Sequence, residues 1–544
     1  MSKKAVFIFF LIIVVASFLR LYKITDVPPG VNRDEASIGY TAYSLLNTGK
    51  DEYGRAFPVS FESFGDWKLP FYIYAVMPLV SIFGLSEFAI RIPSSIFGIL
   101  SVLLTFFLVR IIFKNNLLAL IAMCLAAISP WSIHLSRVES ESNTAVFLTL
   151  LAVICFFKSM EKRKWLIIPS LIFFALTYFT YAGSHIFTTL LLGGLFWLYR
   201  NKMSRARVTV IGLVLFFIMV GFIFYHTLFG ADKTKLSGIS IFGDPSIVHA
   251  KIEIPRNEHE DPSSFISKIT HNRLEFALER ISQNYLNSFS PQFLFIKGGD
   301  NKAHNIEDFG NMYLVEAPFL FLGLIYLIIR KKTKETILIL LWFFIAPIAA
   351  SITKDAPHTN RMFAIFPIHS LIVSFGIYWL LAEILKQKLF KKMLLGFIAG
   401  LFIVNILIYV DRYFVHFPRN EAESWGIGYE ALNELLSSSY SSKKIIMTRP
   451  HYSPYIYLLF YSKYDPVTYQ REVLRYPPTQ DGFVDVKGFG RYEFRDIDWD
   501  KDLQKDAILV AWSSEVPESV NNSYKTKKIT LPNGESMFTI IEAK

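Results

Sequence analysis

The stretch "AVFIFFLIIVVASFLRLY", residues 5–22, decides the class of this protein. At about 1.5 Å per helical residue it crosses most of the roughly 30 Å of hydrocarbon in a bilayer. It follows Lys3 and Lys4, has no small-x-small cleavage site and precedes further apolar runs, so it predicts a retained anchor rather than a signal peptide. With 52% hydrophobic residues and 51 phenylalanines among 544 residues, the chain is predicted to be a polytopic membrane protein.

Eleven apolar runs of this kind are predicted to span the membrane. After the first, they lie near 90–110, 116–133, 143–158, 165–182, 186–199, 208–228, 313–329, 336–352, 362–385 and 393–414. Both cysteines, Cys124 and Cys155, fall within predicted spans, so no disulfide framework is expected.

Basic residues cluster between alternate runs and predict the orientation of the chain. Six connecting segments, which begin at Lys3, Arg110, Lys158, Arg200, Arg330 and Lys386, hold 20 Lys and Arg against three nearby acids. The rest of the chain then carries 36 basic and 42 acidic residues, so the positive-inside rule accounts for the whole net charge of +11. We therefore predict a cytoplasmic N-terminus, an extracytoplasmic C-terminus and no nucleic-acid partner.

The parts outside the membrane are predicted to be a juxtamembrane segment, two outer loops and a C-terminal domain. Residues 69–84 are apolar but short and contain two prolines, so we interpret them as an interfacial or re-entrant segment on the outer face. The predicted domains are a transmembrane catalytic domain, 1–414, with outer loops 23–89 and 229–312, and an outer domain, 415–544. Strand-like runs "KKIIMT", "AILVAW" and "MFTIIE" and a helical "GYEALNELLSS" predict a small α/β fold for the outer domain.

The stretch "VNRDEASIGYTAYSLL", residues 31–46, places two adjacent acids just after the first span. Asn32 is a plausible N-cap and Glu35 stands three residues later, as in a capping box, which gives Glu35 an ordinary structural role. Asp34 heads the apolar stripe of the same helix, and a carboxylate at a helix N-terminus is held ionised. Asp34 is therefore a candidate general base.

Further charged residues gather in segments that are predicted to lie on the same face. "HLSRVESESN" offers Arg137 and Glu141; "KGGDNKAHNIEDFGNMYLVEAP" offers His304 and Glu316; "TKDAPHTNR" offers His358 and Arg361. Short outer loops of this kind converge on the membrane boundary, where a charged lipid headgroup would lie. The sequence contains no Gly-rich phosphate loop with Lys-Ser/Thr, no HExxH and no paired CxxC.

The ordered set of motifs resembles a known family. The early Asp-Glu pair, "WKLPFYIY", "EFAIRIPSSIFGILSVLLTFFLVRIIF" and "ISPWSIHLSR" follow one another as in GT-C glycosyltransferases that use lipid-linked sugars. They are similar to family 39, which includes protein O-mannosyltransferases and lipid A aminoarabinose transferases, and to a bacterial branch of it. The resemblance implies inverting sugar transfer with Asp34 as catalytic base, Arg137 on the donor phosphate and Lys68 near the donor. The chain has Lys-Leu-Pro where the relatives often have Lys-Pro-Pro.

The prediction is therefore a mainly α membrane protein of GT-C fold in the bacterial cytoplasmic membrane, with Asp34 and Glu35 catalytic. The predicted substrate-binding residues are Lys68, Arg137, Glu141, His304, Glu316, His358 and Arg361. No cofactor and no metal ligand is predicted, and a divalent-metal requirement is left open. The predicted partners are the bilayer, a polyprenyl-phosphate-linked sugar and an acceptor glycan, lipid or protein. The alternatives are another GT-C activity, namely an oligosaccharide transferase or polymer ligase, a transporter, and a non-catalytic receptor.

Overall fold

The computed structural model describes residues 1–161, 163–202, 207–229, 240–242, 245–330, 333–384, 386–479 and 482–543. Parts of three predicted basic segments, including Lys162 and residues 203–206 and 331–332, lie outside the described residues. The chain forms two compact units: residues 1–22, 94–136 and 140–409 make unit 1, and residues 23–93, 137–139 and 410–544 make unit 2.

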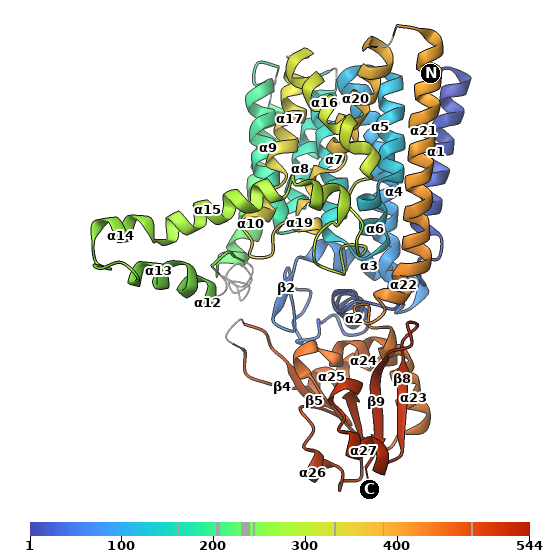
Figure 1. The fold of residues 1–544 in the computed structure, drawn as a ribbon, viewed down its shortest axis with the longest axis vertical. Helices are drawn as coiled ribbons and strands as arrows, with labels where there is room; N and C mark the ends of the chain where they lie inside the picture. Colours follow the sequence, from blue (N-terminus) through green and yellow to red (C-terminus); the bar gives the residue numbers. More distant parts are fainter. Residues whose placement is uncertain are drawn as a thin grey trace. The chain divides into compact units, whose positions relative to one another are not determined.

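Unit 1 is a bundle of apolar helices that run side by side (Figure 1). Its helices are α1 (Lys3–Leu21), α5 (Asn116–Ile128), α6 (Pro130–Arg137), α7 (Glu141–Ser159), α8 (Ile167–Tyr178), α9 (Gly183–Tyr199), α10 (Arg207–Phe229), α16 (Ala317–Arg330), α17 (Lys334–Ile345), α18 (Ile348–Ser351), α19 (Thr359–Met362), α20 (Ile368–Trp379), α21 (Lys388–Asp411) and most of α4 (Glu87–Phe113). Every one of the eleven predicted runs coincides with one of these helices or with a consecutive pair of them.

Among the described residues, six helices are long and apolar enough to cross a membrane, and eight if each of two bent pairs counts as one span. The bent pairs, Asn116–Ile128 with Pro130–Arg137 and Thr359–Ile365 with Ile368–Ala382, each turn by 54°. A proline stands at each break, and proline cannot donate the backbone hydrogen bond that would continue a helix. The prediction of a multi-pass, mainly helical membrane protein is confirmed.

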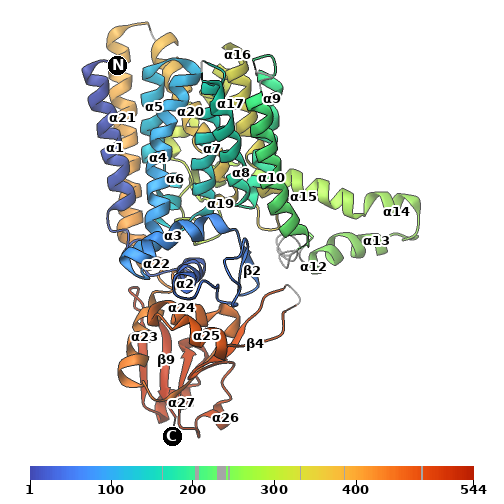
Figure 2. The ribbon, with the colours of Figure 1, turned by 180° about the vertical axis from the view of Figure 1, so that it is seen from behind.

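An arm of short helices projects sideways from the unit 1 bundle, as both views show (Figures 1 and 2). It consists of α12 (Pro245–Val248), α13 (Ile254–Asn257), α14 (Phe265–Thr270) and α15 (Arg273–Asn287). Asn272 caps α15 by accepting hydrogen bonds from the backbone nitrogens of Leu274 and Glu275, 2.8 and 3.0 Å away. The arm belongs to the predicted outer loop 229–312.

Unit 2 contains a seven-stranded sheet of order β4-β5-β6-β3-β7-β9-β8. The strands are β3 (Lys444–Met447), β4 (Leu474–Arg475), β5 (Val486–Phe489), β6 (Tyr492–Phe494), β7 (Ala507–Trp512), β8 (Thr526–Thr530) and β9 (Ser536–Glu542). The central strand β3 is parallel to β6 and β7, with Ile445 opposite Ile508, and the other pairs are antiparallel. The three predicted strands and the predicted helix α23 (Ile427–Ser439) are present, so the predicted C-terminal α/β fold is confirmed.

The two faces of this sheet bury different partners because side chains alternate along a strand. Ile445 and Met447 join a large core that includes residues of α23, α24 (Pro454–Ser462) and the first outer segment. Ile446 belongs to a smaller core on the other face, with residues around α26 (Trp499–Asp502) and α27 (Glu518–Ser523).

The first predicted outer loop shares a hydrophobic core with the C-terminal residues. Its elements are α2 (Arg33–Thr48), the hairpin β1 (Phe61–Ser63) and β2 (Asp66–Lys68), and α3 (Pro70–Phe83). Residues of α2 and α3, including Ile38, Tyr72 and Val76, share one hydrophobic core with the C-terminal sheet. The packing therefore differs from the predicted division at residue 414, since an amphipathic helix buries its apolar stripe wherever a complementary core is available. The 14-residue helix α3 is shorter than a span.

Candidate active site

The helix α2 begins with the predicted capping box. The Asn32 side chain accepts a hydrogen bond from the Glu35 backbone nitrogen at 2.9 Å, and the Glu35 side chain accepts one from the Asn32 nitrogen at 3.4 Å. Because these reciprocal bonds fix the first turn, the side chains of Asp34 and Glu35 leave the helix in defined and different directions.

Glu35 is fully buried and bound on several sides. Its two carboxylate oxygens accept hydrogen bonds from Nε and a terminal nitrogen of Arg91, at 2.9 and 2.8 Å, and Oε1 also accepts one from the Glu139 backbone nitrogen at 3.1 Å. A buried bidentate pair of this kind fixes geometry and leaves the carboxylate little freedom to meet a substrate. The geometry therefore supports a structural role for Glu35, in place of the predicted catalytic one.

Arg91 also fastens the segment that joins the first span to α2. Its guanidinium donates hydrogen bonds to the carbonyl oxygens of Ile24 and Pro28, both at 2.9 Å, and of Gly30. Sequence reasoning did not select Arg91, although a single arginine within the apolar run "AIRIP" is costly unless it has a buried partner.

Arg137 fastens the same segment from another side. Its guanidinium donates to the carbonyl oxygens of Lys23 and Val27, at 3.0 and 2.7 Å, and lies 4.9 Å from the ring centre of Phe414 and 5.6 Å from that of Tyr413. Arg137 is fully buried. In this structure the guanidinium is therefore engaged with backbone carbonyls, and its contact with a donor phosphate stays a prediction.

Asp34 is the accessible member of the acid pair. Its side chain is 49% exposed, and Oδ1 lies 3.1 Å from Nζ of Lys68, which is only 5% exposed. The ammonium of Lys68 also lies 4.3 Å from the ring centre of Phe64, and the Arg33 guanidinium lies at the same distance from that ring. The sequence placed Asp34 at the head of the apolar stripe of this helix, which packs against other protein. Asp34 is instead half open to solvent and held against a buried lysine.

The hairpin that carries Lys68 is held by the C-terminal residues. The Val484 backbone nitrogen donates a hydrogen bond to the Phe64 carbonyl at 3.2 Å. At the turn, Gly65 has a φ of +83°, and a Cβ there would come within 2.3 Å of the Gly482 carbonyl oxygen, so only glycine fits. The C-terminal half of unit 2 therefore sets the position of Lys68.

Tyr457 of α24 completes the surroundings of the acid pair. Burial raises its pKa, and the charges of Arg33, Asp34 and Glu35 act on it. Its ring stacks on that of Tyr429, with centres 4.1 Å apart. No motif in the sequence connected the C-terminal region to the acid pair, because this proximity arises only from the shared core.

Three further predicted residues meet in unit 1. The rings of His304 and His358 have centres 5.2 Å apart, and Nδ1 of His358 accepts a hydrogen bond from the Arg361 backbone nitrogen at 3.4 Å. Arg361 donates to Oγ1 of Thr353 at 2.8 Å and forms an ion pair with Asp355. Burial is the main cause that lowers the pKa of His358, and the neighbouring His304 and Arg361 act in the same direction, so the His358 ring is neutral near pH 7.

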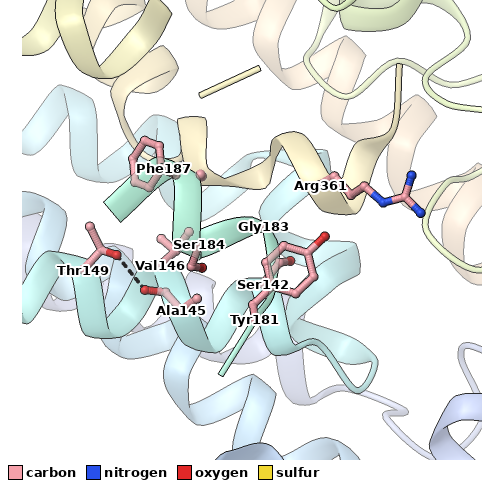
Figure 3. Close-up of a pocket in the computed structure, with 10 residues that line it drawn as sticks. Ser142, Ala145, Val146, Thr149, Tyr181, Gly183, Ser184, Phe187 and Arg361 are labelled. Carbon is pink, nitrogen blue, oxygen red and sulfur yellow. Dashed lines mark hydrogen bonds between the residues drawn. The ribbon is translucent and has the colours of Figure 1, made fainter. Parts of the chain in front are cut away.

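Arg361 borders a pocket in unit 1 with an empty volume of about 270 Å³ including its open side. Figure 3 shows the Arg361 guanidinium directed away from Phe187 and Thr149, and the hydroxyl of Tyr181 on the side of its ring toward Arg361. Lining residues come from α7, α9 and the segment around α19: Ser142, Ala145, Val146, Thr149, Tyr181, Gly183, Ser184, Phe187, Arg361 and Ala364. The lining combines polar side chains, among them those of Ser142, Thr149 and Arg361, with apolar ones such as those of Val146 and Phe187.

The last two predicted residues differ in their placement. Glu141 begins α7, next to the pocket residue Ser142, and its charge acts on Tyr181. Glu316 is buried and accepts a hydrogen bond from the Tyr313 backbone nitrogen at 3.0 Å, so it caps the entry to α16. Within the described part of the chain, no group of three or more His, Cys, Asp or Glu residues could hold a metal ion.

Comparisons with known proteins agree with this architecture. The family model described as "Dolichyl-phosphate-mannose-protein mannosyltransferase" matches residues 68–225. A comparison with curated proteins found no match. ArnT from Cupriavidus metallidurans bound to undecaprenyl phosphate matches with a TM-score of 0.56 at 12% identity, over 100% of this chain and 99% of that chain. The apo form of ArnT gives a TM-score of 0.54 at 12% identity, over 99% and 98% of the two chains.

The oligosaccharyltransferase of Archaeoglobus fulgidus in its apo form matches with a TM-score of 0.52 at 15% identity, over 85% of this chain. The chain spans 64% of the length of that protein. At such identities the likeness concerns the fold. The chain therefore has the GT-C fold, and its predicted resemblance to the GT-C membrane glycosyltransferases of the mannosyltransferase and ArnT type is confirmed.

Proposed function

We propose that this chain is an inverting glycosyltransferase that moves a sugar from a polyprenyl-phosphate donor to an acceptor hydroxyl, with Asp34 as the general base. The observation that carries the proposal is the contrast within the acid pair: Asp34 is half exposed and touches Lys68, whereas Glu35 is enclosed by Arg91. One carboxylate is thus available for chemistry, and its neighbour is used to position it.

The chemistry that we propose needs one base and one cation. The acceptor oxygen attacks the anomeric carbon, its proton passes to the Asp34 carboxylate, and the bond from the anomeric carbon to the phosphate oxygen breaks with inversion. The leaving polyprenyl phosphate is a stable anion, so it requires a nearby positive charge and no general acid. Lys68 supplies that charge within 3.1 Å of Asp34, which supports its proposed role despite the altered residue that follows it.

The solved relatives support a lipid-linked donor. ArnT was crystallised with undecaprenyl phosphate, and the Archaeoglobus fulgidus enzyme AglB with an inhibitory peptide and a dolichol-phosphate. We further propose that His304, His358, Arg361 and Glu141, which surround or border the unit 1 pocket, contact the donor or acceptor. The proposed setting is the bacterial cytoplasmic membrane, with the N-terminus inside and residues 415–544 outside.

Replacement of Asp34 tests the proposal. Asp34→Asn keeps the size and hydrogen-bonding ability of the side chain but removes its basicity, so we expect loss of transfer with normal amounts of protein in the membrane. The measurement is mass spectrometry of cell-envelope glycans in a deletion strain that carries either the wild-type or the variant gene. The strain with Asp34→Asn should lack the same sugar as the empty deletion strain.

Asp26→Asn is the matched control, because Asp26 is an exposed acid in the segment just before α2. That variant should restore the glycan fully. A strain with Asp34→Asn that makes the glycan at the wild-type level would rule out Asp34 as the base.

A further inference from the structure

The arm of unit 1 carries a continuous row of exposed apolar side chains. Phe265, Ile266 and Ile269 of α14 and Leu274 and Leu278 of α15 are each between 53% and 78% exposed. Such a row is unusual in water, where a monomeric surface seldom exposes more than a few adjacent large apolar residues. Within the part of the chain that the structure describes, no other segment covers these side chains.

The row on α15 occupies one face of the helix. Leu274, Leu278, Ile281 and Tyr285 recur at intervals of four, three and four residues, which aligns them along one side of an α-helix. Away from this row, the amide of Gln283 donates a hydrogen bond to Glu279 at 2.9 Å, although Leu286 is also exposed near Glu279 and Phe276 is buried. Helix α15 is therefore amphipathic, with its apolar side away from Glu279.

The C-terminal end of α15, where the arm joins the bundle, is hydrogen-bonded to a membrane span. These bonds set the level of the arm along that span. The span Lys334–Ser351 ends at Ser351, whose carbonyl accepts a hydrogen bond from the Asn284 amide at 2.9 Å. The Tyr285 hydroxyl reaches further and donates to the Phe344 carbonyl, also at 2.9 Å. Phe344 stands roughly 10 Å before the end of the span at 1.5 Å per residue. The hydroxyl of Tyr285, on the apolar face, therefore reaches a level of the span at which acyl chains would surround the protein.

A span that precedes the arm in the chain also exposes apolar side chains that lipid would cover. The span α10 precedes the arm in the chain and exposes Phe217, Tyr225 and Phe229 along its length. Exposed cations, Lys268 and Arg273, flank the apolar row and suit the phosphates of lipid headgroups. This combination of an apolar face, adjacent cations and an anchor at the end of a span is typical of helices that lie in the membrane interface.

We propose that α14 and α15 lie in the headgroup region of the bilayer that holds the spans, with their apolar face among the acyl chains. The arm is then a second attachment to the membrane, besides the spans themselves. The arm also holds the segment between α18 and α19 in place. Asn284 donates a hydrogen bond to the Thr353 carbonyl at 3.1 Å, and the Thr353 hydroxyl accepts one from Arg361. This inference does not depend on the proposed enzymatic activity.

Site-directed fluorescence tests the proposal on the full chain in nanodiscs. Cys124 and Cys155 are replaced by alanine, and a single cysteine at Leu278 or, as matched control, at its polar neighbour Glu279 is labelled with the environment-sensitive dye NBD. We expect Leu278→Cys to give blue-shifted emission and to lose roughly half or more of it when brominated lipids replace ordinary ones, since interfacial helices bury their apolar face in the acyl boundary. Glu279→Cys should emit as in water, with little quenching.

Three results would overturn the proposal. Water-like emission at both positions would mean that the arm stands free of the membrane. Blue-shifted emission at Leu278→Cys without quenching by brominated lipid would mean that protein, such as a second copy of the chain, covers this face. Equal quenching at both positions would mean that the helix is immersed without a preferred side.

Discussion

Two segments that connect spans, residues 23–93 and 245–312, differ in which side chains they bury and which they expose. The first encloses charges: Glu35 and Arg91 are fully buried against each other, and Lys68 is nearly so. The second exposes apolar groups: Phe265 and Leu278 have no covering partner among the described residues. Both segments connect spans of one membrane protein, so their position in the chain does not account for the difference.

The difference indicates which environment suits each segment. Burying a charge costs desolvation free energy. A buried ion pair can offset part of that cost and fix a local geometry, and the proposed role of Asp34 requires such a fixed geometry. Exposing large apolar side chains is costly in water but not in lipid. The first segment therefore suits the proposed site for chemistry, and the second suits the proposed contact with the bilayer.

Breaking the buried ion pair of Glu35 and Arg91 should have the largest effect on the free energy of unfolding. Arg91→Met removes the partner of a fully enclosed Glu35 and the donor to three backbone carbonyls. Breaking one side of a buried ion pair costs about 3–5 kcal/mol. Chemical denaturation of the purified chain in detergent, followed by fluorescence, should show a loss of that size in the free energy of unfolding.

Two further variants separate the ion pair from ordinary surface charge. Arg471→Met removes an exposed arginine that pairs with Glu472, and it should change the free energy of unfolding by less than about 1 kcal/mol. Combining Arg91→Met with Glu35→Gln should recover part of the loss, because no unpaired charge then remains buried. If Arg91→Met were as mild as Arg471→Met, the pair would not hold the segment.

Much of the fold could be predicted from the sequence because membrane spans leave a strong local signal. The apolar runs and the alternating strands of the C-terminal region correspond to helices and to β3, β7 and β9. The union of residues 23–93 with the C-terminal sheet could not be predicted. It depends on side chains far apart in the sequence, such as Ile38 and Ile445, that meet only in the folded core.

The buried carboxylate of Glu52 provides a second way to sharpen the comparison. Glu52 accepts hydrogen bonds from the hydroxyls of Tyr455, at 2.9 Å, and Ser63, at 3.2 Å. Burial raises its pKa from 4.5 to about 7, although the charge of Arg475 acts in the opposite direction. The folded chain therefore binds this proton more tightly than the unfolded chain, and stability falls as pH rises between these two values.

Glu52→Gln should remove this pH dependence. Relative to the wild type, the variant should gain about 3 kcal/mol in the free energy of unfolding between pH 4.5 and pH 7.5, as measured by denaturation at each pH. Glu518→Gln, at an exposed position of α27, should show no such change with pH. A constant difference between Glu52→Gln and the wild type would mean that Glu52 is ionised throughout.

The candidate site was predictable in its residue types but not in its division of roles. The sequence identified Asp34, Glu35, Lys68 and Arg137, and all four belong to one unit. The sequence did not show that Arg137 would donate hydrogen bonds to the carbonyls of Lys23 and Val27. Nor did it show that Arg91 would form an ion pair with Glu35. Such assignments depend on which buried acceptor each guanidinium reaches, and local spacing does not encode that.

The smallest expected effect is that of Leu278→Ala, which is best compared with the same substitution at a buried position, Leu459. Leu459→Ala in α24 empties a fully buried position of the unit 2 core and should cost about 2–5 kcal/mol. Leu278→Ala in the arm leaves no cavity, because its side chain contacts solvent or lipid rather than protein, and should cost less than about 0.5 kcal/mol. Parallel denaturation curves in detergent measure both. A loss at Leu278 comparable to that at Leu459 would mean that protein covers the arm, and the contrast between the two outer segments would then no longer hold.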